Sequence, residues 1–155
     1  MIHIENDNAF VEIQDTNRFF HAHIIVRYGG GQKLCWGKGT TCWGAEIYLE
    51  EFSQVLIGED CMLSDSKIRG SDGHSILDNQ TGEIINKQRR PLIIENHVWC
   101  ASGAKITKNA HIHTGSVVGA NAVATKDYLE SNVCIVGNPA KIVKRGITWD
   151  RKNTY

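Results

Sequence analysis

A repeat of six residues constrains this chain more than any other feature of its sequence. From Ile94 onward an aliphatic or small side chain occupies every sixth position, and another follows four residues later. The first series is Ile94, Cys100, Ile106, Ile112, Val118 and Ala124, and the second is Val98, Ala104, Ala110, Ser116 and Ala122. A strand alternates its side chains every two residues and a helix returns every 3.6, so neither gives a period of six.

A period of six fits a short strand, whose central aliphatic side chain points inward, followed by a turn at a small residue. Three such units make one triangular coil, and successive coils stack at the ~4.8 Å spacing of neighbouring strands. The sequence therefore predicts an all-β fold, a parallel β-helix built from hexapeptide repeats.

The pattern is looser in the first half of the chain. Residues 36–41 and 57–62 each read as one hexapeptide, and residues 42–47 and 63–68 continue them. We therefore extend the β-helix to near the N-terminus, as a single domain over residues 1–155. A β-sandwich is the alternative for this half.

The repeat is interrupted once, by a polar, turn-rich insertion at about residues 69–92. A loop of this length on a solenoid is usually functional. His74 lies near its beginning, and with an ordinary pKa of ~6.5 a histidine is well suited to accept a proton near neutral pH. A lone histidine in a loop more often has no catalytic role, but its place in the one long interruption favours a general base. Asp72 is a candidate to orient or polarise it.

The amino-acid composition limits the classes of partner and indicates the cellular compartment. Lys plus Arg equals Asp plus Glu at 17 each, which argues against nucleic acid or an anionic membrane as the main partner. No basic segment followed by an apolar stretch begins the chain, and no apolar run reaches the ~20 residues of a membrane helix, so we expect neither signal peptide nor span. Five cysteines without a CxxC pair predict reduced thiols in the cytoplasm.

Four segments resemble the hexapeptide-repeat acetyltransferases: residues 71–75, 94–99, 118–127 and 136–145, the last with the sequence Gly-Asn-Pro-Ala-Lys. The similarity runs from residue 36 to about 151 and is densest from residue 93. It is strongest to O-acetyltransferases that act on galactosides, nodulation factors and bacterial capsular or polysialic polysaccharides. The resemblance implies a left-handed β-helix that transfers acetyl from acetyl-CoA to a hydroxyl of a sugar or surface polysaccharide, without a metal.

The resemblance also implies roles for individual residues. His74 matches the general base of a direct transfer, and Trp99 matches a tryptophan beside the thioester and the acceptor. The residues matched to cofactor positions are Ser102 beside the pantetheine arm, Ala120, Thr125 and Lys126 in the groove, and Lys141 and Lys144 near the CoA phosphates, with Arg145 adjacent. Cys100-Ala101 after the tryptophan and residues 128–130 depart from the family pattern, but neither involves the proposed base.

Assembly is implied by the same resemblance. A short solenoid leaves flat faces and open ends, and three prisms side by side form three equivalent clefts. We expect a homotrimer in which His74 of one subunit faces a CoA groove completed by its neighbour, with Trp99 opposite the base. The tail, residues 146–155, is expected to cap the last coil.

Other functions stay open. A γ-class carbonic anhydrase has the same fold with zinc on three histidines, but His97, His111 and His113 do not match its ligand spacing. A non-catalytic solenoid is a second alternative. N-acetylation of an amino sugar nucleotide and O-acetylation of serine are alternatives within the enzyme class.

Overall fold

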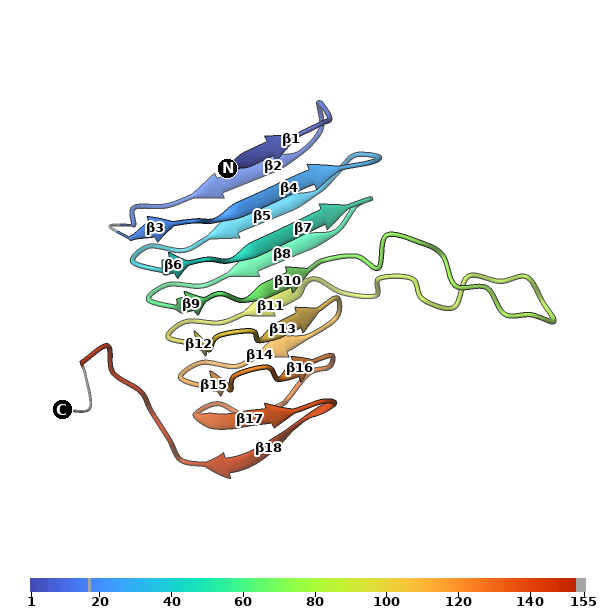
Figure 1. Ribbon diagram of the computed structural model, residues 1–155. Helices are drawn as coiled ribbons and strands as arrows, with labels where there is room; N and C mark the ends of the chain where they lie inside the picture. The colour runs from blue at the N-terminus through green and yellow to red at the C-terminus, as the bar shows by residue number, and fades with distance from the viewer. Residues whose placement is uncertain (17, 153–155) are drawn as a thin grey trace.

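The computed structural model describes residues 1–16 and 18–152, and the regular elements within them are all strands. The strands form three sheets that are the faces of a prism, and as far as β16 each sheet takes every third strand of the chain (Figure 1). The chain is a left-handed parallel β-helix of about six coils, which confirms the predicted fold class. No helix in the described residues is long and apolar enough to cross a membrane.

We name the sheets A, B and C in the order in which each coil visits them. Sheet A contains β1 (Ile2–Ile4), β4 (His23–Arg27), β7 (Glu46–Glu50), β10 (Lys67–Arg69), β13 (Lys105–Thr107) and β16 (Val123–Ala124). Sheet B contains β2 (Phe10–Ile13), β5 (Lys33–Trp36), β8 (Gln54–Ile57), β11 (Leu92–Ile94) and β14 (His111–Ile112). Sheet C contains β3 (Phe19–Phe20), β6 (Thr41–Trp43), β9 (Met62–Ser64), β12 (Trp99–Cys100), β15 (Val117–Val118), β17 (Val133–Gly137) and β18 (Ala140–Arg145).

The core is a set of vertical stacks of inward side chains, one stack for each central position of the repeat. In sheet A, Ile24, Ile47, Ile68, Ile106 and Ala124 pair in sequence, and each is fully buried. Similar stacks in sheets B and C consist of Trp36, Ile57, Ile94 and Ile112, and of Cys42, Leu63, Cys100, Val118 and Ile135. These inward stacks include the first series of the repeat, so the period of six predicts the core correctly.

The first coils belong to the same solenoid although their repeat is loose. Ile24 and Ile47 are neighbours in sheet A, as Ile106 and Ala124 are, but they lie further apart along the chain. The additional residues lie mainly at the corner between sheets A and B, where Gly29 has a positive φ of 68° that suits a residue without Cβ. The β-sandwich alternative for this half is therefore wrong.

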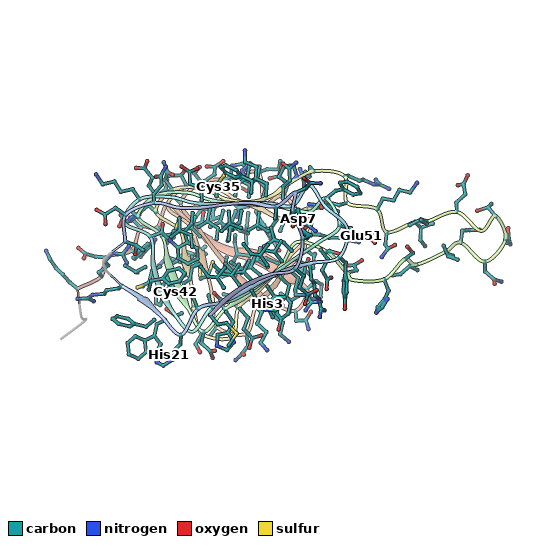
Figure 2. The ribbon with its side chains drawn as sticks, turned by 90° about the horizontal axis from the view of Figure 1, so that it is seen from above. His3, Asp7, His21, Cys35, Cys42 and Glu51 are labelled. Atoms are coloured by element: carbon teal, nitrogen blue, oxygen red, sulfur yellow. The ribbon has the colours of Figure 1, made fainter. Side chains whose placement is uncertain are left out.

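The interruption leaves the A/B corner between β10 and β11 and projects away from the prism (Figures 1 and 2). Its outer part, residues 76–85, is a hairpin: Leu77 and Ile84 form an antiparallel bridge, and Asp78 Oδ1 accepts two backbone N–H bonds in the turn. We call it the hairpin arm. Its aliphatic side chains are 42–56% exposed: Ile76, Leu77, Ile84 and Ile85.

The C-terminal end of the solenoid is closed by β18, which pairs antiparallel with β17. The following tail runs back along the corner between sheets B and C (Figure 1). There Trp149 Nε1 donates to the His97 carbonyl at 2.8 Å, and Arg151 Nη2 binds Asp60 Oδ1 at 2.8 Å. The expectation that the tail caps the last coil is wrong, because β18 takes that place; residues 153–155 lie outside the described part.

Candidate active site

A cleft of about 770 Å³ opens at the base of the interruption. Both ends of the loop line it, together with Lys108 from the next coil and the corner residues Glu51 and Phe52 from the coil before. Figure 2, which looks along the solenoid axis, shows that the loop leaves at the corner where Glu51 lies. We call this the loop cleft.

His74 lies in the wall of the loop cleft with an exposed side chain. Gly73 before it has a φ of 78°, and a Cβ there would lie 3.1 Å from the buried Glu50 Oε2, so glycine suits this position in two ways. Exposure leaves the imidazole accessible to an incoming substrate. The main chain of His74 is held instead, since its carbonyl accepts a 2.9 Å bond from Asn86 Nδ2.

Asp72 lies in the same cleft, but its carboxylate contacts other groups than the His74 imidazole. Its Oδ2 accepts hydrogen bonds from Asn86 Nδ2, at 2.8 Å, and from the Lys108 ammonium. Burial opposes ionisation of this carboxyl, but the bonds from Lys108 and Asn86 outweigh it and lower its pKa. Asp72 is therefore a charged anchor of the loop main chain.

Asn86 connects the two ends of the loop. Its amide nitrogen donates to Asp72 and to the His74 carbonyl, while its Oδ1 accepts from the Ile76 N–H at 2.8 Å. Its own carbonyl accepts from Lys108. Asn86 and Lys108 are the residues of this site that the sequence analysis missed. The available signal for Asn86 was its position, as a polar residue directly after the aliphatic pair 84–85 in a turn-rich segment. Nothing in the sequence pointed to Lys108.

The loop cleft is rich in cations. Its basic residues are Lys87, Arg89, Arg90 and Lys108, and its acidic residues are Glu51 and Asp72. Arg90 is held by Asp127, at 2.9 Å, and Lys108 by Asp72. Among the described residues, neither Lys87 nor Arg89 forms an ion pair, so these two charges remain available to an anionic ligand.

Trp99 lies at a different corner from His74. It begins β12, just after the corner between sheets B and C, whereas the loop leaves the A/B corner (Figure 1). It does not line the loop cleft; its ring lies 6.3 Å from that of Trp149 in the tail, and its buried indole N–H has no hydrogen-bond partner within residues 1–16 and 18–152. One chain therefore does not bring His74 and Trp99 together.

The residues matched to cofactor positions also lie at different corners of the prism. Ser102 and Ala120 lie on successive coils at the corner between sheets C and A, linked by a bond from the Asn121 N–H to the Ser102 carbonyl. Thr125 and Lys126 are exposed at the A/B corner, below Lys108.

The three basic residues matched to the CoA phosphates lie on β18, at the end of the solenoid. Lys141 and Lys144 are exposed, whereas Arg145 forms a two-pronged ion pair with Glu130 at 2.7 and 3.0 Å. The two lysines are thus more available to a phosphate than Arg145.

Known proteins share this architecture. The solved polysialic-acid-specific acetyltransferase NeuO superposes with a TM-score of 0.75 and 30% identity, over 96% of this chain and 72% of the other. The chain belongs to the hexapeptide-repeat acetyltransferases. The polysialic acid O-acetyltransferase OatWY superposes with a TM-score of 0.77 at 28% identity, over 100% of this chain and 93% of the other.

Curated relatives match this chain over part of their own length. Two of them are polysialic acid O-acetyltransferases, from Neisseria meningitidis, at 42% identity over 73% of this chain, and from Escherichia coli O1:K1, at 34% over 78%. The chain spans 53% and 39% of their lengths, respectively. No protein-family model matches the chain.

The thiols of this chain are poorly placed to act as nucleophiles. All five cysteines are unpaired and buried or half-buried. Burial raises the pKa of Cys61 to about 11 and raises that of Cys100 as well. Because the thiolate is the reactive form, neither side chain is activated near neutral pH.

Proposed function

We propose that this protein transfers an acetyl group from acetyl-CoA to a hydroxyl of a sugar or bacterial surface polysaccharide, with His74 as the general base. The observation that carries the proposal is the accessible His74 imidazole in an open cleft with two unpaired cations, Lys87 and Arg89. An acidic sugar polymer matches these charges. The relatives named as polysialic acid O-acetyltransferases support this choice.

The transfer is direct in this proposal. A neutral His74 nitrogen accepts the proton of the acceptor hydroxyl while the oxygen attacks the thioester carbonyl. The new C–O bond forms, the C–S bond breaks, and the CoA thiolate leaves and takes up a proton. The high pKa of the Cys61 thiol supports a route without an acetyl-cysteine.

Asp72 acts through the loop in this proposal. Its carboxylate, with Asn86 and Lys108, fixes the main chain on either side of His74, so it is a positioning residue. The donor occupies a groove near Trp99, Ser102 and Ala120, with Thr125 and Lys126 along it and its phosphates near the basic residues of β18. A solved hexapeptide-repeat acetyltransferase of Vibrio cholerae is named as a complex with acetyl coenzyme A.

A homotrimer reconciles these positions. His74, Trp99 and Ser102 lie at three different corners of one prism, so only a neighbouring prism can place another Trp99 near a given His74. The hairpin arm fits this arrangement, because in a trimer a neighbouring subunit covers its exposed aliphatic side chains. We propose the cytoplasm as the compartment, in keeping with acetyl-CoA as donor and with five unpaired thiols.

The test is release of CoA thiol from acetyl-CoA with a panel of acidic and neutral oligosaccharides. His74→Ala is expected to lower turnover with the best acceptor at least ~100-fold, the usual loss when a general base is removed. Binding of CoA, measured by calorimetry, stays near wild type, and Ser75→Ala serves as the control in the same loop. Wild-type turnover in His74→Ala would show that another group takes the proton.

A further inference from the structure

Two histidines and two acids converge on the outer face of sheet B, and none of the four lines the loop cleft. His111 and His113 are two residues apart on one extended segment, so both side chains point outward while Ile112 points into the core. Glu95 lies beside His113 in the coil above, and Asp127 bridges to His111 in the coil below.

The imidazoles are held as a pair between the two carboxylates. Their rings stack with centroids 3.9 Å apart and 21° between the planes. On one edge, Glu95 Oε1 lies 2.7 Å from His111 Nε2 and 3.3 Å from His113 Nδ1. On the opposite edge, Asp127 lies 2.8 Å from His113 Nε2 and 3.6 Å from His111 Nδ1.

We propose that Glu95, His111 and His113 form a binding site for one divalent transition-metal ion. One ligand atom from each lies within 4.8 Å of the others, and all three side chains are half-buried. Two imidazole nitrogens and a carboxylate oxygen suit zinc, cobalt or nickel, whereas calcium and magnesium prefer oxygen ligands alone.

Two of the three distances between ligand atoms are close to those of a loaded site, and the stacked imidazole rings have to turn toward one another so that both lone pairs point at the ion. Ligand bonds of ~2.0–2.1 Å in a tetrahedron place neighbouring ligand atoms ~3.3 Å apart. The contact between Glu95 and His113 already has this length, and the contact between Glu95 and His111 has to open by ~0.6 Å. Thr114 holds the other Glu95 oxygen through its N–H and hydroxyl, which orients the carboxylate as an outer partner should.

Asp127 serves the site from the far edge. Its contact with His113 Nε2 fixes which nitrogen of that ring carries the proton, leaving Nδ1 free to bind an ion. Because Arg90 at the end of the loop also binds Asp127, an ion here ties three coils and the loop base together.

The experiment uses the full chain without an affinity tag, stripped with a chelator and then titrated with Co²⁺ or Zn²⁺ alone. We expect one ion per chain, a visible Co²⁺ absorption band and a rise in Tm with Zn²⁺. His111→Ala and His113→Ala should each abolish the band, Asp127→Asn should weaken binding about tenfold, and the exposed His23→Ala should leave it unchanged.

Two results would overturn the site: absence of binding by the stripped wild-type protein at micromolar ion, or an unchanged titration in the double variant of His111 and His113. If the alanine variants do not fold, His113→Gln preserves a polar side chain and is titrated instead, with the same loss expected. The proposed metal site does not depend on acetyl transfer. CoA binding is measured separately, and we expect it to be the same with and without the ion.

Discussion

At the scale of single residues, the site depends on how the main chain around His74 is held. The imidazole itself is exposed, and the described hydrogen bonds reach only its carbonyl. Asn86 makes that bond and two others, to Asp72 and Ile76. One amide side chain thus joins the beginning and the end of a long loop.

Replacing Asn86 tests this positioning. Asn86→Ala is expected to lower kcat by about tenfold to a hundredfold, because a base displaced by ~1 Å loses its attack geometry. KM for acetyl-CoA should stay within about twofold, since the side chain of Asn86 bonds only to the loop and to none of the residues proposed along the donor groove. Asn79→Ala, in the exposed turn of the hairpin arm, is the control. A wild-type kcat in Asn86→Ala would remove Asn86 from the positioning role.

At the scale of elements, most of the short strands are stabilised by the one or two side chains that each sends into the prism. On β13, Ile106 is fully buried between Ile68 and Ala124, while its neighbour Lys105 is exposed. Ile106→Ala is expected to lower the free energy of unfolding by about 2–5 kcal/mol, and Lys105→Ala by less than about 0.5 kcal/mol. Urea unfolding of the two variants checks this difference, and equal losses would contradict the inward assignment.

The tail is a second element whose attachment can be tested by pH. Burial of Asp60 opposes its ionisation, but bonds with His97 and Arg151 outweigh this and lower its pKa below the ordinary value. When folding lowers the pKa of a carboxyl, the charged group stabilises the folded state at every pH above its pKa in the unfolded state. This stabilisation is lost as the pH falls through its pKa in the folded state. We therefore expect the tail to loosen as pH falls below ~4.

The measurement is amide hydrogen exchange of the tail around Trp149, at pH 7 and at pH 3. Asp60→Asn should loosen the tail already at pH 7, as acid does in the wild type. Asp78→Asn is the matched control, because the pKa of Asp78 is also lowered, but by backbone bonds in the distant hairpin arm. Equal protection of the tail in Asp60→Asn and wild type would contradict the role of this carboxylate.

At the scale of the whole molecule, the positions of His74 and Trp99 make a prediction about assembly. If one active site takes His74 from one subunit and Trp99 from its neighbour, two inactive variants can complement each other. Mixed trimers of His74→Ala and Trp99→Ala chains contain clefts in which both side chains are intact.

The two variants are refolded together in equal amounts, and transfer is compared with each alone. Random mixing restores about a quarter of the wild-type activity, because one cleft in four combines the two intact residues. The control is the same mixture of folded trimers that have not exchanged subunits. Activity no greater than the sum of the two variants would place both residues of a site on one chain.

Part of this protein could be predicted from its sequence because that part depends on local alternation. Which side of a strand Ile106 occupies follows from the residues around it, and the stacking of coils then follows from a constant period. The same regularity made the interruption around His74 visible. The loose period before residue 36 was less informative, because extra residues at one corner shift the phase of the repeat without changing the fold.

Only the tertiary structure decided which distant residues meet. Asn86 reaches His74, Lys108 reaches Asp72, and the tail returns to Asp60, because stacking brings together residues that are far apart in the chain. It also placed Trp99 at another corner from His74, although the resemblance to the acetyltransferase family assigned both to one site. The sequence by itself determined a solenoid with one long interruption. The corner at which each residue lies depends on the number of residues in each turn, which local patterns do not encode, and our proposal of a neighbouring subunit rests on those corners.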